Sequence, residues 1–255
     1  MKAYKEQLAP STYEDGHALH LVVAAWDEPE PLDTKYGRGC SKAYPLSERF
    51  TADMHEVARN LAGRADDPSL YVSMFMGFNT YACTKDAYKP DSLNEAYYKA
   101  LKDRYLEVLR IFHDEAPNAR VSLGWDGWEA RIDDRPERGG GPSMFKHFAD
   151  VMRKSDFQSF GMRETDGSNM ANVEAMVTTL GKYGPVMVAY HQPWEDPLPL
   201  FDREVRQLLT DDVLDTLVDR GLFAWSFTDG KPMSKSARVE KFLEDAVRTY
   251  GRKDR

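Results

Sequence analysis

The feature that most limits how this chain can fold is an alternation of short apolar runs with longer amphipathic stretches. In each stretch, apolar residues recur three and four positions apart, as they do on one face of an α-helix. Because strands that alternate with helices build parallel sheets, we predict an α/β fold. The six apolar runs, each expected to be a strand, are residues 20–26, 70–78, 119–125, 156–162, 185–191 and 222–227.

Helices are expected between these runs. Glycine or proline follows most of the helical stretches, at the place where helices usually stop. The apolar runs are nearly continuous, which is typical of strands buried on both faces. The expected helices are residues 47–61, 94–115, 143–154, 169–180, 201–218 and 236–250.

The repeat favours a TIM-type (β/α) barrel. A chain of 255 residues has the usual length of one such barrel, so residues 1–255 are expected to form a single domain. Six recognisable units are two fewer than a closed barrel needs, which predicts an incomplete or irregular barrel. An open doubly wound sheet is the alternative, although no strand is followed by a Gly-x-Gly-x-x-Gly turn or a phosphate loop.

The net charge and hydropathy of the chain argue against nucleic acids and membranes as binding partners. Asp and Glu outnumber Lys and Arg by 42 to 34, and the net charge of −8 disfavours phosphate backbones and anionic membranes. No run reaches the roughly 18 apolar residues of a membrane-spanning helix, and the N-terminal segment lacks the apolar centre of a signal peptide. We expect a soluble protein of unassigned location that binds neither nucleic acid nor membrane.

A second copy of the chain could cover an exposed edge strand of an incomplete barrel. Cys40 and Cys83 are expected to be free thiols, with a disulfide as the alternative.

Tryptophans and polar side chains gather where the apolar runs end, and strand ends carry the working residues of α/β folds. An indole ring stacks on the C–H face of a sugar, while carboxylates, amides and imidazoles bind its hydroxyls. The alternative for each tryptophan is that it caps the core. The pattern predicts a poly- or oligosaccharide site whose substrate-binding residues are Trp26, Asn79, Tyr81, Trp125, Trp128, Arg131, His191, Trp194 and Asp229.

Glycosidic cleavage needs two carboxyl groups, one that donates a proton and one that is ionised. Glu164 is the preferred acid, because it directly follows an apolar run and partial burial would raise its pKa. Asp126, between two tryptophans, is the preferred partner, and Asp27 is the next candidate. Each of these acids could instead cap a helix or bind a neighbouring arginine. This chemistry requires no cofactor and no metal.

Several segments resemble the later strands of clan A glycoside hydrolase barrels, especially the mannanase-like and xylosidase-like families. LYVSMFMGFNTY, followed by YYKALKDRYLEVLRIFHDEAPNARVSLGW, is similar to a strand and helix of those barrels. KYGPVMVAYHQP resembles the strand that bears their nucleophilic glutamate, and GLFAWSFTDG resembles their closing strand with its tryptophan. The resemblance implies a (β/α) barrel that cleaves glycosidic bonds with paired carboxylates.

The chain departs from that family pattern at both catalytic positions. Thr80 stands where the family places its acid, and Tyr190 or His191 where it places its nucleophile. The first two barrel strands would also be absent. Two hypotheses stay open. The first is a hydrolase whose chemistry has moved to Asp27, Asp126 and Glu164. The second is a non-catalytic glycan-binding or structural barrel, such as a surface or virion component. A metal-dependent hydrolase using His17 and His20 is a third hypothesis.

Overall fold

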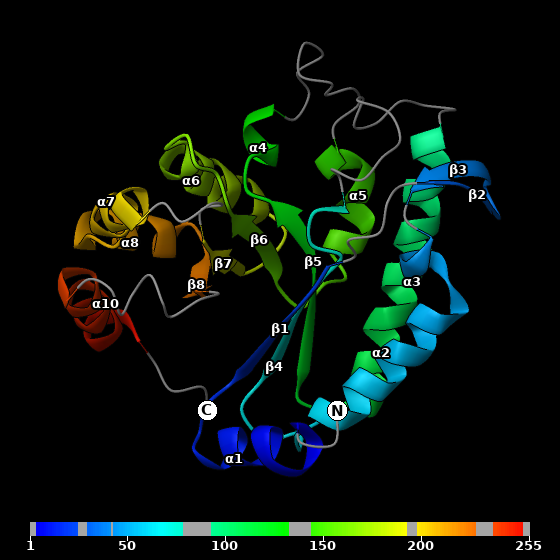
Figure 1. The fold of residues 1–255 in the computed structure, drawn as a ribbon, viewed down its shortest axis with the longest axis horizontal. Helices are drawn as coiled ribbons and strands as arrows, with labels where there is room; N and C mark the ends of the chain where they lie inside the picture. The colour runs from blue at the N-terminus through cyan, green and yellow to red at the C-terminus, as the bar shows by residue number, and fades with distance from the viewer. Residues whose placement is uncertain are drawn as a thin grey trace. The chain divides into compact units, whose positions relative to one another are not determined.

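Parallel strands alternate with helices along the chain, which confirms the predicted α/β class (Figure 1). The computed structural model describes residues 4–24, 30–41, 43–78, 93–132, 144–192, 198–227 and 237–251. Each parallel strand coincides with a predicted apolar run: the starts agree to within two residues, whereas β1, β4 and β8 end three, four and two residues before the predicted runs do. The strands are β1 (Leu19–Val23), β4 (Leu70–Met74), β5 (Ala119–Asp126), β6 (Gln158–Met162), β7 (Val186–His191) and β8 (Leu222–Trp225).

The helices also follow the expected order, with one break. The predicted helix over residues 201–218 is two helices, because Thr210 has an extended backbone and begins a new helix. The π-helical turn η1 (Tyr4–Leu8) and α1 (Ala9–Glu14) occupy the segment before β1. The remaining helices are η2 (Tyr44–Leu46), α2 (Glu48–Leu61), α3 (Leu93–Glu115), α4 (Glu129–Ile132), α5 (Met144–Met152), α6 (Asn169–Leu180), α7 (Leu198–Leu208), α8 (Asp211–Asp219) and α10 (Ala237–Tyr250).

Contacts divide the chain into two compact units. Unit 1 takes in residues 1–125 and 132–156, and unit 2 takes in residues 126–131 and 157–253. The strand order is β1-β4-β5 in the first group of strands and β6-β7-β8 in the second. The expectation of one domain over the whole chain stays a prediction.

Unit 1 combines its parallel strands with the packed helices α2 and α3 (Figure 1). Leu19 pairs with Leu70, and Leu70 with Ala119, so the three strands start in register. An antiparallel hairpin of β2 (Glu30–Thr34) and β3 (Gly37–Ser41), which the sequence did not predict, contacts α3. Its few apolar residues explain why no strand pattern was visible there.

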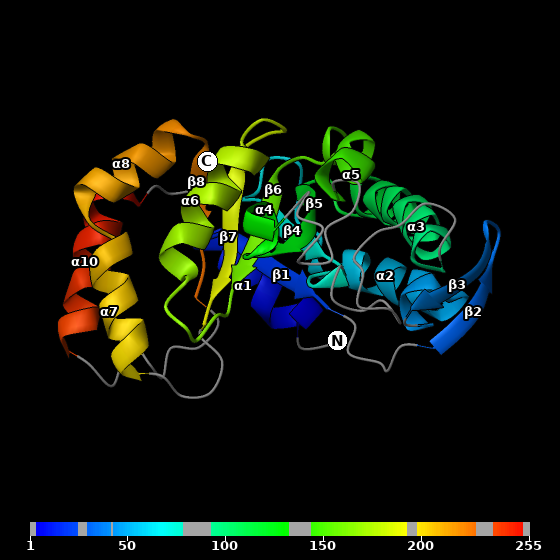
Figure 2. The same ribbon diagram turned by 90° about the horizontal axis from the view of Figure 1, so that it is seen from above.

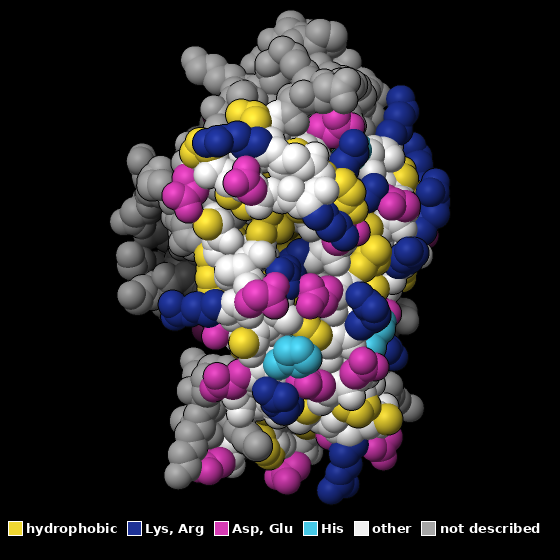
Figure 3. Space-filling model, turned by 90° about the vertical axis from the view of Figure 1, so that its right-hand side faces the viewer, with side chains coloured by type: hydrophobic (Ala, Val, Ile, Leu, Met, Phe, Trp, Pro, Cys, Tyr) yellow, Lys and Arg dark blue, Asp and Glu magenta, His cyan; other side chains and the backbone are white. Residues whose placement is uncertain are grey.

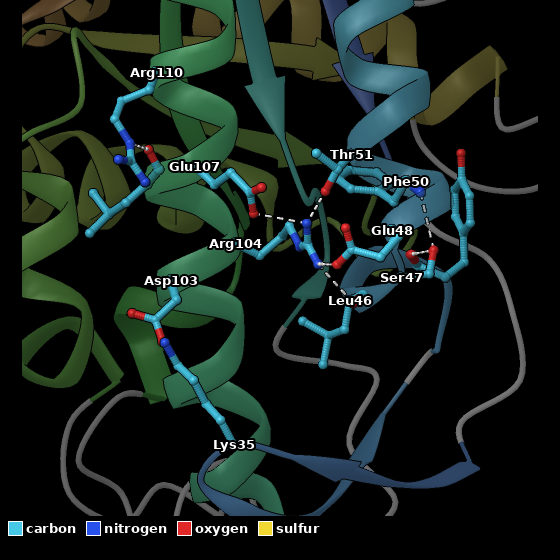
Figure 4. A network of polar contacts seen from close by, with 12 residues as sticks. Lys35, Leu46, Ser47, Glu48, Phe50, Thr51, Asp103, Arg104, Glu107 and Arg110 are labelled. Carbon is cyan, nitrogen blue, oxygen red and sulfur yellow. Dashed lines mark hydrogen bonds and ion pairs between the residues drawn. The ribbon is translucent and has the colours of Figure 1, made fainter.

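Arg104 joins α3 to the start of α2 (Figure 4). Its Nη2 donates to the Leu46 carbonyl at 2.9 Å, and its Nη1 donates to Glu107 Oε2 at 2.8 Å and to the Thr51 hydroxyl. The Ser47 hydroxyl caps α2 by accepting from the Phe50 backbone N–H at 3.1 Å. These bonds fix where α2 begins relative to α3.

The face of unit 1 shown in Figure 3 carries basic and acidic side chains intermixed, without a broad field of one sign. Binding to a phosphate backbone usually requires a cluster of Lys and Arg. The expectation that the chain binds no nucleic acid stays a prediction. No helix in the described ranges is both long and apolar enough to cross a membrane.

Unit 2 consists of β6, β7 and β8 with α6, α7, α8 and α10. α7 and α10 lie side by side (Figure 2) and pack around an apolar cluster. Its buried members are Phe201, Val205, Leu209, Leu214 and Val239.

Two glycines allow close backbone packing at the ends of the strands. A Cβ on Gly127 would overlap the carbonyl oxygen of Gly161, and a Cβ on Gly161 would overlap the ring of Tyr190. The pairing of β6 with β7 shifts between Phe160 and Gly161, at this same place. The turn after β5 therefore lies at a distance from the backbone of β6 that only glycine permits, and Gly161 leaves space for the ring of Tyr190.

Candidate functional site

The candidate site lies in unit 2, where several strands end. Asp126 is the last residue of β5, Arg163 and Glu164 follow β6, and His191 is the last residue of β7. Parallel strands bring their carboxyl ends to one edge of a sheet, and ligands of α/β proteins bind at that edge. The side chains at these positions, and those that hold them, make up the site.

Asp126 and Arg163 form an ion pair in which the aspartate is buried and the arginine is partly exposed. Arg163 Nη2 donates to Asp126 Oδ1 at 2.6 Å, and Asp126 is only 2% exposed. The guanidinium also lies 5.8 Å from the centre of the Tyr190 ring. Burial raises the pKa of Asp126 although the charge of Arg163 opposes that shift. Within the described part of the chain, Asp126 Oδ2 has no hydrogen-bond partner.

Glu164 has a half-buried carboxyl group. Burial raises the pKa of Glu164, the negative charges of Asp166 and Asp126 raise it further, and the charge of Arg163 opposes them. This direction agrees with the one expected from its place after an apolar run. A carboxyl group whose pKa is raised keeps its proton to higher pH and is suited to donate it.

Behind Glu164 lies a fully buried hydrogen-bond network. Asn169, the first residue of α6, accepts from the Glu164 backbone N–H at 3.3 Å and donates to its carbonyl at 2.9 Å. The same amide nitrogen lies 3.0 Å from each carboxylate oxygen of Glu204. His191 Nε2 is 2.9 Å from Glu204 Oε2. Asn169, Glu204 and His191 thus connect α6, α7 and β7 with the backbone of Glu164.

Aromatic rings surround His191. The ring centres of Phe201, Phe227 and Trp225 lie 5.2, 5.7 and 5.9 Å from the centre of its imidazole. His191 is 2% exposed, so its predicted contact with substrate is not available in this arrangement of side chains. Among the described residues, nothing forms a hydrogen bond with its Nδ1 atom.

The tryptophans expected to bind sugar differ in exposure. Trp125 is fully buried in unit 1, where Phe78, Phe145 and Phe148 surround it, so it takes the core-capping role that was the alternative for it. Trp128, in unit 2, is partly exposed. Arg131 is exposed and donates to Asn172 at 3.1 Å. Among the predicted binding residues that the structure describes, Trp128 and Arg131 are therefore those open to solvent.

The other predicted site residues lie outside the described residues. They are Trp26, Asp27, Asn79, Tyr81, Trp194 and Asp229. Thr80, Cys83 and the side chain of Cys40 also lie outside them.

His17 and His20, the two histidines of the metal hypothesis, lie in different environments. His17 is exposed, whereas His20 lies in β1 with its Nε2 atom 2.9 Å from the Ser73 hydroxyl. Burial lowers the pKa of His20 to about 4. Over the described residues, no group of three or more His, Cys, Asp or Glu side chains is placed to hold a metal ion.

Sequence reasoning missed Asn169 and Glu204. One signal for Glu204 was present, because it lies in phase with Phe201, Val205 and Leu208 on the apolar face of α7. A charged residue in such a stripe is usually paired, but the pattern does not name the partner. Asn169 gave no signal beyond its place at the start of a helix.

Comparison with models of known protein families finds no family that matches this chain, and comparison with curated proteins finds no matching protein.

Proposed function

We propose that this protein is a carbohydrate-active enzyme of the glycoside hydrolase type, built on an incomplete TIM-type barrel, with Glu164 as its proton donor. The observation that carries the proposal is the half-buried Glu164 carboxyl group, whose pKa is raised by burial and by neighbouring carboxylates. Glycosidic cleavage requires such a group to protonate the departing oxygen. The resemblance to clan A barrels supports the same reaction class.

Asp126 is the second carboxyl group in this proposal. Arg163 holds one of its oxygens, and Oδ2 is buried without a partner among the described residues, so the proposal requires neighbouring side chains to move before water or a sugar hydroxyl reaches it. In the reaction, Glu164 gives its proton to the glycosidic oxygen as the bond to the sugar carbon breaks. Water adds to that carbon, and its proton passes to the ionised carboxylate. Trp128 and Arg131 would bind the sugar nearby.

A non-catalytic glycan-binding protein is the second candidate. The observation in its favour is the near-complete burial of Asp126, because a carboxylate held by Arg163 and hidden from solvent is poorly placed to meet substrate. Binding through Trp128 and Arg131 would not need that carboxylate.

Release of new reducing ends from a panel of neutral and acidic polysaccharides separates the two candidates. An enzyme releases reducing ends, and Glu164→Gln lowers the rate about 10²–10⁴-fold, the usual contribution of a general acid. Glu174→Gln is the matched control, because Glu174 is an exposed acid on α6 that pairs with Arg220. Equal rates for Glu164→Gln and the wild type would rule out Glu164 as the donor. Retention on a polysaccharide without release favours the binding protein.

A further inference from the structure

The backbone of Glu164 is held on both sides by one side chain. The Asn169 amide accepts from the Glu164 N–H and donates to the Glu164 carbonyl, at 3.3 and 2.9 Å. This two-point contact restricts rotation about the backbone bonds of Glu164. Asn169 therefore restrains the backbone from which the Glu164 side chain extends.

Glu204 fixes the orientation of the Asn169 amide. The amide nitrogen has two hydrogens, and only one is used by the Glu164 carbonyl. The other points to Glu204, whose two oxygens are both 3.0 Å away. If the amide turned over, its oxygen would face a carboxylate and both contacts with Glu164 would be lost.

His191 completes the network. Its Nε2 atom lies 2.9 Å from Glu204 Oε2, and an ionised carboxylate would accept the hydrogen bond from it. Asn169, Glu204 and His191 are all at least 98% buried. A buried carboxylate is rarely the most stabilising choice, because well-packed apolar residues can serve as well or better. A charge retained behind the candidate donor is therefore better explained by what it positions.

We propose that Asn169, Glu204 and His191 are positioning residues, joined in one buried hydrogen-bond network that holds the backbone of Glu164 at the end of β6. The proposal rests on the proposed function only in giving Glu164 the role of proton donor. The network itself acts on a backbone and needs no substrate to be tested.

The test is an NMR titration of the Glu164 carboxyl group in the full-length chain with isotopic labels. In Asn169→Ala the carboxyl group gains freedom to reach water, so its raised pKa falls toward the ordinary value for glutamate. Asn118→Ala is the matched control. Asn118 is also a buried asparagine that binds two backbone groups, those of Gly63 and Pro68, and it leaves the titration of Glu164 unchanged.

Two substitutions of Glu204 sharpen the test. In Glu204→Gln an amide oxygen in the place of Oε2 can accept from both Asn169 Nδ2 and His191 Nε2, so the network is kept. The Glu164 titration is then preserved. Glu204→Leu offers neither contact, so the Glu164 pKa falls as it does in Asn169→Ala. If the enzyme is active, Glu204→Leu lowers kcat about 100-fold with little change in KM, as misplacement of a reacting group does.

A folded Asn169→Ala variant in which Glu164 titrates as in the wild type would overturn the proposal. If that variant does not fold, the two Glu204 variants decide: a Glu164 titration that is kept in Glu204→Gln and shifted in Glu204→Leu supports the network, and an unshifted titration in Glu204→Leu overturns it. Because these signals are read without substrate, they stand even if no polysaccharide is cleaved. Loss of activity in Glu164→Gln beside an unshifted titration in Asn169→Ala would keep the function and remove the network.

Discussion

Each unit contains a buried asparagine that binds the backbone at two points. In unit 1, Asn118 accepts from the Gly63 N–H and donates to the Pro68 carbonyl, both at 2.8 Å, where the chain leaves α2 and approaches β4. In unit 2, Asn169 makes the same kind of contact with Glu164, beyond the end of β6. The first asparagine lies where strands begin and the second where they end.

The difference between the two asparagines is in their further partners. Asn118 binds two neutral backbone groups and interacts with the hydroxyl of Tyr13, as a residue that shapes a loop would do. Asn169 also binds a buried carboxylate and holds a residue whose own carboxyl group is half exposed. The same amide can thus serve the fold in one place and a site in another, and its charged neighbours distinguish the two roles.

The largest difference in stability between the units should come from removing one partner of an ion pair in each. Arg163→Met leaves Asp126 buried and unpaired, so we expect the free energy of unfolding to fall by about 3–5 kcal/mol. The pair of His113 and Asp156 in unit 1 is more exposed, and His113→Gln should cost at most about 1 kcal/mol. Urea unfolding measures both.

A control isolates the unpaired charge as the cause. Asp126→Asn in the Arg163→Met background should restore most of the lost stability, because no buried charge then remains. Similar losses for Arg163→Met and His113→Gln would remove the contrast between the two pairs.

The asparagines themselves should differ less. Asn118→Ala and Asn169→Ala each leave buried backbone groups unsatisfied, which usually costs about 1–3 kcal/mol. Asn169→Ala should cost more, because it also removes a donor from Glu204. Urea unfolding of the two variants side by side checks the order, and a larger loss for Asn118→Ala would reverse our comparison.

The N-cap residues of α2 and α8 should differ less in their contribution to stability. The Ser47 hydroxyl caps α2, whereas Thr210, at the start of α8, makes no capping bond through its side chain. Ser47→Ala should lower the free energy of unfolding by about 1 kcal/mol, and Thr210→Ala by only a few tenths (~0.3 kcal/mol). Thermal unfolding at a fixed scan rate would show the difference, and equal shifts in Tm would contradict it.

The smallest expected effect is a pH-dependent gain in Glu164→Gln. Burial raises the pKa of Glu164 in the folded state, so ionisation of this group opposes folding. The stability contributed by its protonated form is complete below the unfolded-state pKa of about 4.3 and is lost as pH rises through the folded-state pKa. Glutamine cannot ionise.

Near neutral pH, Glu164→Gln should therefore be more stable than the wild type by at most about 0.5 kcal/mol, because solvent screens a partly exposed group. In acid the gain should vanish. Urea unfolding at several pH values tests this expectation, and a gain of the same size at every pH would contradict the assigned cause.

The strands were predictable because strands buried on both faces give continuous apolar runs. The break between α7 and α8 was not, since Leu208, Leu209 and Leu214 keep an apolar face across Thr210. That break depends on the backbone conformation of one residue. The local sequence does not determine it.

The candidate site was predictable only in part. Asp126 and Glu164 could be selected because strand ends are recognisable in the sequence. Trp125 and Asp126 are neighbours, and successive side chains of a strand point to opposite faces, but the sequence does not say which face meets the core. Asn169 and Glu204 come into contact only because α6 packs against α7, and their spacing in the sequence does not predict that contact.

The close approach at Gly127 and Gly161 limits how this protein could be remodelled. A side chain at Gly127 would meet the backbone of Gly161, so the turn that follows Asp126 cannot move closer to β6 or carry a larger residue without a backbone shift. Substitutions can change the side chains around these two glycines, but the close approach of the backbone at Gly127 stays the same. Adaptation to a bulkier ligand would have to come from the loops that connect strands to helices.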